Sequence, residues 1–312
     1  MRFDRDFLFG VATAAYQIEG AVDEDGRGKT IWDTFCDIPG KIARGESGQI
    51  AIDHYHLWKQ DIAIMKELGV NSYRFSTAWA RMFPDGTLNS RNQKGFDFYN
   101  KLIDELLANE IKPLVTLFHW DLPQALQDNG GWANRETTSH FADYAKAAAQ
   151  AFGDRVEIFA PINEPWVHSW LGHALGYHAP GLMDYEVAIT ASHHTVLAHN
   201  LALQAIKSVN SKLKVGPVQS QSNPDVDDIF DEKQIYAAKV FDMNQNLFWM
   251  DAFFKGEYPA LAYELYGDRL TKVIREGDLT KQPHDFIGIN YYFNNRIGHE
   301  VSTDHPNKVR VV

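Results

Sequence analysis

A run near the middle of the chain carries residue types that could act on sugars. Pro161-Ile162-Asn163-Glu164-Pro165-Trp166 places a carboxylic acid beside an amide, directly after an apolar stretch. Cleavage of a glycosidic bond uses two carboxyl groups, one of which is kept protonated near neutral pH to serve the leaving oxygen. Glu164 is a candidate for that acid. By itself, the Asn-Glu-Pro tripeptide is better explained as a turn at the end of a strand, so its interpretation depends on the rest of the chain.

Other polar and aromatic residues also follow apolar runs. Gln, His, Asn and Glu side chains can pair with neighbouring sugar hydroxyls, and Trp or Tyr rings offer flat faces to a pyranose. If the runs are parallel strands of a barrel, the residues after them meet at one mouth. We therefore expect one site built from many loops, with these members: Gln17, Glu19, Arg74, His119, Trp120, Asp121, Asn163, Glu164, Trp166, Asn290, Tyr291 and Tyr292.

The elements that must position these residues alternate in type along the chain. Apolar spacing predicts six strands, at residues 7–12, 70–75, 111–117, 157–162, 214–219 and 285–290, and helices at 53–69, 96–107, 134–152, 189–208 and 235–246. This order is typical of an α/β protein with a parallel sheet. No linker divides it, so we expect a single domain over residues 1–312. A doubly wound sheet and a (β/α)8 barrel both fit, but the dinucleotide fingerprint is absent after the first strand.

Composition excludes several classes of function. The net charge of -11 on 312 residues argues against nucleic-acid and anionic-membrane partners, which require a basic face. The amino-terminal residues lack the pattern of a signal peptide, and no apolar run reaches membrane-spanning length, so a cytoplasmic protein is expected.

His193, His194 and His199 lack the His-Glu-x-x-His arrangement and are expected to be hydrogen-bonded core residues. No metal or cofactor is predicted.

Several blocks of the sequence are similar, in the same order, to glycoside hydrolase family 1. The resemblance covers essentially the whole chain. The blocks are Phe9-Gly10-Val11-Ala12-Thr13-Ala14-Ala15-Tyr16-Gln17-Ile18-Glu19-Gly20, Ile31-Trp32-Asp33-Thr34-Phe35, Tyr73-Arg74-Phe75-Ser76, Phe118-His119-Trp120-Asp121-Leu122-Pro123, Asn163-Glu164-Pro165-Trp166 and Asp285-Phe286-Ile287-Gly288-Ile289-Asn290-Tyr291-Tyr292.

This resemblance implies a retaining mechanism on a (β/α)8 TIM barrel, with Glu164 as acid and later as base toward water. It implies that Arg74 and Tyr292 hold the nucleophilic carboxylate ionised and oriented. Trp166 resembles the wall of the aglycone side. The residues expected to bind the sugar are Gln17, His119, Trp120, Asn163 and Asn290.

The family's second carboxylate, in a Glu-Asn-Gly motif on the seventh strand, has no counterpart before Val312. About six of eight strands are expected, with the barrel incomplete before strands 7 and 8 and open edges on the first and sixth strands. Asp121 is the other carboxylate at a nearby strand end, but the resemblance makes it a supporting residue. We therefore expect a complementing carboxyl-terminal fragment, and little or no activity from the 312 residues alone.

Three functions remain open from the sequence. A β-glucosidase acting on terminal β-D-glucosides is favoured by Trp120 and the Leu122-Pro123-Gln124-Ala125-Leu126 run. A 6-phospho-β-glycosidase is the enzymatic alternative, because the residues that would separate the two lie in the absent part. The third is a noncatalytic sugar-binding fragment of a glycosidase barrel.

Overall fold

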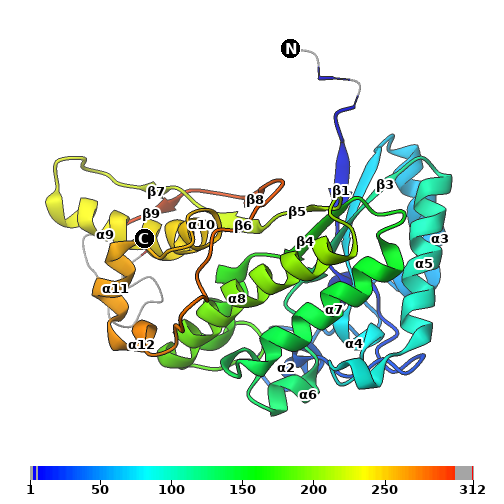
Figure 1. Cartoon of the computed structure of the whole chain (residues 1–312), viewed down its shortest axis with the longest axis horizontal. Helices are drawn as coiled ribbons and strands as arrows, with labels where there is room; N and C mark the ends of the chain where they lie inside the picture. The colour runs from blue at the N-terminus through cyan, green and yellow to red at the C-terminus, as the bar shows by residue number, and fades with distance from the viewer. Residues whose placement is uncertain (1–2, 5, 299–310, 312) are drawn as a thin grey trace. The chain divides into compact units, whose positions relative to one another are not determined.

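The computed structural model describes residues 3–4, 6–298 and 311 (Figure 1). The chain divides into two compact units that interleave along the sequence. The first unit takes in residues up to 131, 139–162 and 202–215, and the second takes in 132–138, 163–201 and the residues from 216 on. That both belong to one catalytic domain stays a prediction.

The first unit is built on a parallel sheet of five strands in the order β1-β2-β3-β4-β5. In register, Ala12 lies opposite Arg74, and Arg74 lies opposite Leu114. Because each crossover between the first four strands carries helix, the neighbouring strands can run parallel. The strands are β1 (Gly10–Ala12), β2 (Ser72–Ser76), β3 (Lys112–Phe118), β4 (Ile158–Ile162) and β5 (Lys214–Val215).

Helix α5 illustrates why the helices of this unit form where they do. Its apolar residues recur every three or four positions, and Phe96, Tyr99, Leu102, Ile103 and Leu106 are all buried. The sequence predicted this helix correctly. The helices in or entering this unit are α1 (Ala15–Ile18), α2 (Ile31–Cys36), α3 (His54–Glu67), α4 (Trp79–Met82), η1 (Leu88–Ser90), α5 (Gln93–Ala108), α6 (Gln124–Asp128), η2 (Gly131–Ala133) and α7 (Glu136–Phe152).

The second unit has two small parallel pairings, β6 with β8 and β7 with β9. A cluster of buried apolar side chains around Trp170, Phe248 and Trp249 forms its core. Helix α8 runs from this unit into the first. The elements are η3 (Val167–Ala174), α8 (Tyr185–Val209), β6 (Val218–Gln221), β7 (Pro224–Asp225), α9 (Glu232–Asp242), η4 (Met243–Leu247), α10 (Phe248–Phe254), α11 (Ala260–Tyr266), α12 (Asp268–Thr271), β8 (Gly288–Tyr291) and β9 (Asn295–Arg296).

The structure differs from the sequence predictions at the fifth strand and at the helix that follows it. The strand predicted at 214–219 is divided into β5 and β6 at Gly216 and Pro217. Proline has no N–H for a ladder, and a Cβ at Gly216 would lie 2.1 Å from the carbonyl oxygen of Phe286, so this point is a close backbone crossing. The helix predicted at 235–246 changes from α9 to the π-helix η4 at Met243. No helix in the described part of the chain is long and apolar enough to cross a bilayer.

Candidate active site

Asn163 and Glu164 lie directly after β4, where the sequence placed them. The Glu164 side chain is buried, with only 4% of the residue exposed. Its N–H donates to the carbonyl oxygen of Val218 at 2.8 Å, and Asn163 forms a parallel bridge with the same residue. The backbone of Glu164 is left-handed, with φ of 49°. A non-glycine residue in this region is uncommon, and such strained residues cluster at functional sites.

Asn290, at the end of β8, supplies the amide that contacts Glu164. Its Nδ2 donates to Oε1 of Glu164 at 2.6 Å and to Oδ1 of Asn163 at 3.1 Å. A carboxyl group held by a donor is restricted in orientation, which suits proton transfer along one direction. The sequence predicted that Asn290 binds sugar, but it did not predict that Asn290 contacts Glu164. The two residues are far apart in the chain, and no local pattern reports their contact.

Trp166 and Tyr292 also belong to the second unit. The indole Nε1 of Trp166 donates to Oδ1 of Asn244 at 2.6 Å, and Asn244 in turn donates to the hydroxyl of Tyr266. The Trp166 indole is therefore held at its N–H edge by hydrogen bonds that run through Asn244 to Tyr266, which the sequence did not predict. Tyr292 is 75% exposed.

In the first unit, Arg74 and His119 come from neighbouring strands. Arg74 lies within β2 rather than after it, and its Nε donates to Oγ1 of Thr116 at 2.9 Å. His119 and Trp120 follow β3, with their rings in an edge-on arrangement at 5.0 Å. Trp120 has φ of 73°, a second non-glycine residue in the left-handed region at a strand end. Gln17 lies on the one-turn helix α1 and is exposed.

Burial shifts the pKa values of the two residues that flank Trp120 in the sequence. Burial lowers the pKa of His119 to about 3, and the charge of Arg74 adds to this, so the imidazole is neutral at physiological pH. A neutral imidazole can donate from one nitrogen and accept at the other, which suits a sugar hydroxyl. Burial raises the pKa of Asp121 to about 7, and this residue is 1% exposed. A carboxyl group so enclosed is poorly placed to attack a sugar as a nucleophile.

The expected site residues therefore fall into two sets. The first unit holds Gln17, Arg74, His119 and Trp120, and the second holds Asn163, Glu164, Trp166, Asn290 and Tyr292. Within the second set, Asn163, Glu164 and Asn290 are in direct contact. Within the first, Arg74 and His119 interact electrostatically.

The three histidines of α8 are hydrogen-bonded core residues, as predicted. His193 contacts Tyr258 and Asp278, His194 contacts the carbonyl oxygen of Trp132, and His199 contacts His284. The described residues include no group of three His, Cys, Asp or Glu side chains that could hold a metal ion.

Comparison with known proteins places this geometry in a family. Residues 1–310 match the family described as Glycosyl hydrolase family 1. The chain belongs to glycosyl hydrolase family 1. β-Glucosidase A of Acetivibrio thermocellus is 44% identical over 307 residues, which are 97% of this chain and 68% of that protein. The β-glucosidase of an Agrobacterium species is also 44% identical, over 96% of this chain and 65% of that protein.

Solved structures agree with this assignment. The β-glucosidase from Thermotoga maritima in complex with castanospermine has a TM-score of 0.91 and 40% identity, and the match covers 99% of this chain and 69% of that one. This family 1 chain is a glycoside hydrolase with an α/β fold, that of a TIM barrel incomplete relative to these longer proteins. The family and fold class predicted from the sequence are thus confirmed, and the chain spans about two thirds of the relatives' length.

Proposed function

We propose that this chain carries the acid/base half of a retaining β-glucosidase that hydrolyses terminal β-D-glucosides. Glu164 protonates the glycosidic oxygen and afterwards removes a proton from water. The observation that most supports this role is the Glu164 carboxyl itself, buried on a left-handed backbone and held at 2.6 Å by the amide of Asn290. The names of the relatives, several of them β-glucosidases, support the substrate class.

The other residues keep the roles that the family resemblance implies. Gln17, His119, Trp120, Asn163 and Asn290 bind the sugar, and Trp166 contacts the aglycone. Arg74 and Tyr292 orient a nucleophilic carboxylate. We propose that this carboxylate is supplied by a complementing carboxyl-terminal segment. In support, β8 pairs with β6 alone among the described strands, and the side chains of Ile289, Tyr291 and Phe293 are more than half exposed.

The substitution Glu164→Gln tests the acid role. The chain is assayed together with the part of the A. thermocellus relative that the match leaves uncovered. Hydrolysis of β-glucosides with poor leaving groups should fall by about 100-fold or more, whereas activated aryl glucosides should lose much less, because only the former need the proton. Glu157→Gln is the matched control. Glu157 is exposed and immediately precedes β4, the strand that Glu164 follows, so this substitution should change neither rate.

Equal losses on both classes of substrate would remove Glu164 from the acid role. Faster cleavage of an aryl 6-phospho-β-glucoside than of the aryl β-glucoside would instead identify a 6-phospho-β-glycosidase. Binding of a glucoside without any cleavage, even with the added segment, would identify a noncatalytic sugar-binding protein. Formation of the α-anomer as the first product, observed by NMR, would contradict retention.

A further inference from the structure

The carboxylate of Glu19 and the guanidinium of Arg81 form a buried ion pair in the first unit. Nε of Arg81 lies 2.9 Å from Oε2 of Glu19, and the two side chains are 1% and 5% exposed. Nη2 of Arg81 also donates to the carbonyl oxygen of Gly20 at 3.1 Å. One cation thus binds both the side chain of Glu19 and the backbone that follows it.

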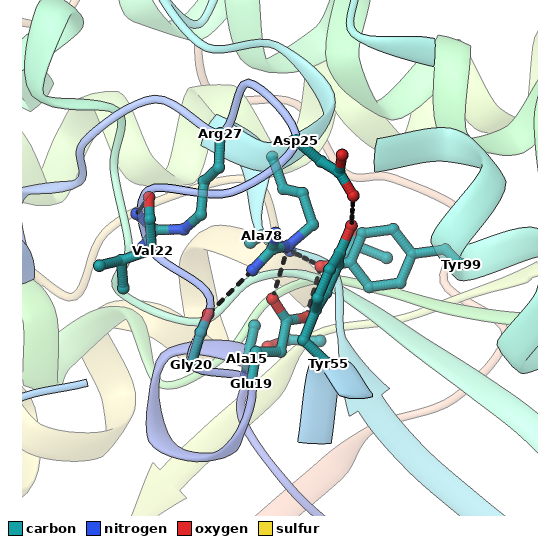
Figure 2. Close-up of polar contacts among 12 residues, drawn as sticks. Ala15, Glu19, Gly20, Val22, Asp25, Arg27, Tyr55, Ala78 and Tyr99 are labelled. Atoms are coloured by element: carbon teal, nitrogen blue, oxygen red, sulfur yellow. Dashed lines mark hydrogen bonds and ion pairs between the residues drawn. The ribbon is translucent and has the colours of Figure 1, made fainter. Parts of the chain in front are cut away.

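Tyr99, on α5, contacts the second oxygen of Glu19. Its hydroxyl donates to Oε1 at 2.6 Å and accepts the N–H of Ala78 at 2.7 Å (Figure 2). Burial raises the pKa of Tyr99 well above its ordinary value, and the charge of Glu19 adds to this. The hydroxyl therefore remains a donor at any physiological pH. We refer to Glu19, Arg81 and Tyr99 as the Glu19 cluster.

Tyr55 contacts both members of the pair. The centre of its ring lies 4.2 Å from the guanidinium carbon of Arg81, a cation–π distance. Its backbone N–H donates to the carbonyl oxygen of Glu19 at 3.0 Å, and its hydroxyl donates to Asp25 at 2.7 Å. Glu19 is therefore bound through both its side chain and its backbone.

These contacts hold one end of the short segment that carries Gln17. At the other end, the N–H of Ala15 donates to Oγ of Ser76 at 2.7 Å, and the N–H of Thr13 donates to the carbonyl oxygen of Arg74 at 2.9 Å. Gly20 ends the segment with φ of 68°, where a Cβ would lie 2.3 Å from the carbonyl oxygen of Ile50. A helix of one turn has too few internal hydrogen bonds to be stable alone, so these external contacts set its position.

A buried ion pair contributes little net stability compared with apolar residues of the same volume, because both ions lose their hydration. It does define a single geometry, since its directional hydrogen bonds are lost when either partner moves. We propose that the Glu19 cluster is a positioning device that holds α1 so that the amide of Gln17 is ready to bind sugar hydroxyls. The inference rests on the proposed function only for the sugar-binding role of Gln17.

The first test measures hydrogen exchange and needs no catalysis. Tyr99→Phe removes one donor to Glu19 and keeps the ring. Tyr144→Phe is the matched control, because Tyr144 is also fully buried in this unit and its hydroxyl bonds Thr77 and the carbonyl oxygen of Leu117 instead. Amides of residues 14–20 should exchange about 10-fold faster in Tyr99→Phe and remain unchanged in Tyr144→Phe. Unchanged exchange in Tyr99→Phe, or the same acceleration across the unit in both variants, would overturn the inference.

The second test measures binding of deoxynojirimycin, a ligand of the T. maritima relative, by calorimetry. Tyr99→Phe should weaken binding about fivefold when Gln17 is present and should have no effect in a Gln17→Ala background, because the cluster acts through Gln17. Losses that multiply in the double variant would contradict this. Arg81→Lys, which keeps the charge but changes the donor geometry, replaces Tyr99→Phe if that variant does not fold. If the unsubstituted chain binds no deoxynojirimycin, the sugar-binding function fails, while the exchange experiment still decides the positioning role.

Discussion

The side-chain amide of Asn290 donates to Oε1 of Glu164 at 2.6 Å. Both residues belong to the second unit, and the contact occupies one oxygen of the proposed catalytic acid. The same amide contacts Asn163 at 3.1 Å, so one side chain orients both members of the Asn-Glu pair. Asn290 is thus placed to align Glu164, in addition to the sugar-binding role predicted for it.

Asn290→Ala should lower the hydrolysis of β-glucosides with poor leaving groups by about 10-fold, and that of activated aryl glucosides by less, because a misaligned acid transfers its proton less effectively. Steady-state kinetics with the complemented chain measures both. Asn294→Ala is the control, since the Asn294 amide donates to the carboxylate of Asp225 at 2.8 Å. A loss that is independent of the leaving group would indicate a sugar-binding role alone.

Asp121→Asn should stabilise the protein at alkaline pH. Burial raises the pKa of Asp121 from 3.8 to about 7, so the folded state holds a proton that the unfolded state releases above pH 3.8. The contribution of the Asp121 carboxyl to the stability of the wild type is therefore complete below pH 3.8. It is lost as the pH rises toward 7. At pH 8 the variant should exceed wild type by roughly 1–3 kcal/mol in the free energy of unfolding.

Urea denaturation at pH 4 and pH 8 measures this difference, which should vanish at the lower pH. Asp128→Asn serves as the control, because Asp128 is exposed on the nearby helix α6. A stability gain in Asp121→Asn that is equal at both pH values would show that the charge of Asp121 is not its cause.

Asp278 accepts hydrogen bonds from several directions in the second unit. Both terminal nitrogens of Arg135 bind its carboxylate, the N–H of Arg275 donates to it at 2.8 Å, and Nε2 of His193 lies 2.9 Å away. Asp278→Ala should lower the free energy of unfolding by roughly 3–5 kcal/mol, because it removes a buried carboxylate and leaves the buried His193 and the partly buried Arg135 without their acceptor. Asp268→Ala, at an exposed position, should cost less than about 0.5 kcal/mol.

The same carboxylate predicts a pH dependence. Burial alone would raise the pKa of Asp278, but the bonds from Arg135, Arg275 and His193 lower it from 3.8 to about 2. The contribution of Asp278 to the free energy of unfolding is therefore present above pH 3.8 and is lost as the pH falls toward 2. Wild type and Asp278→Ala should converge in stability across that range, as measured by thermal unfolding. A constant difference down to pH 2 would contradict this assignment.

Local patterns in the sequence were sufficient for much of the fold. The apolar spacing of α5 and the apolar run of β3 each depend on residues a few positions apart, and both elements form close to where they were predicted. The helix predicted at 53–69 forms as α3, but the side chain of Asp53 does not cap its amino end. Asp53 adopts φ of 56° and makes no side-chain cap bond, and its carboxylate instead contacts the His56 ring at 2.6 Å.

Helix and strand periodicity, together with motif order, determined the fold class, the family and the placement of Glu164 after the fourth strand. Only the tertiary structure decided which side chains hold the expected site residues in place: the amide of Asn290 on Glu164, Asn244 on Trp166, and Arg81 with Tyr99 on Glu19. The physical reason is the separation along the chain between the residues that interact. Periodicity reports which face of an element is buried, whereas a hydrogen bond between distant residues depends on how separate elements pack, to within a few tenths of an ångström.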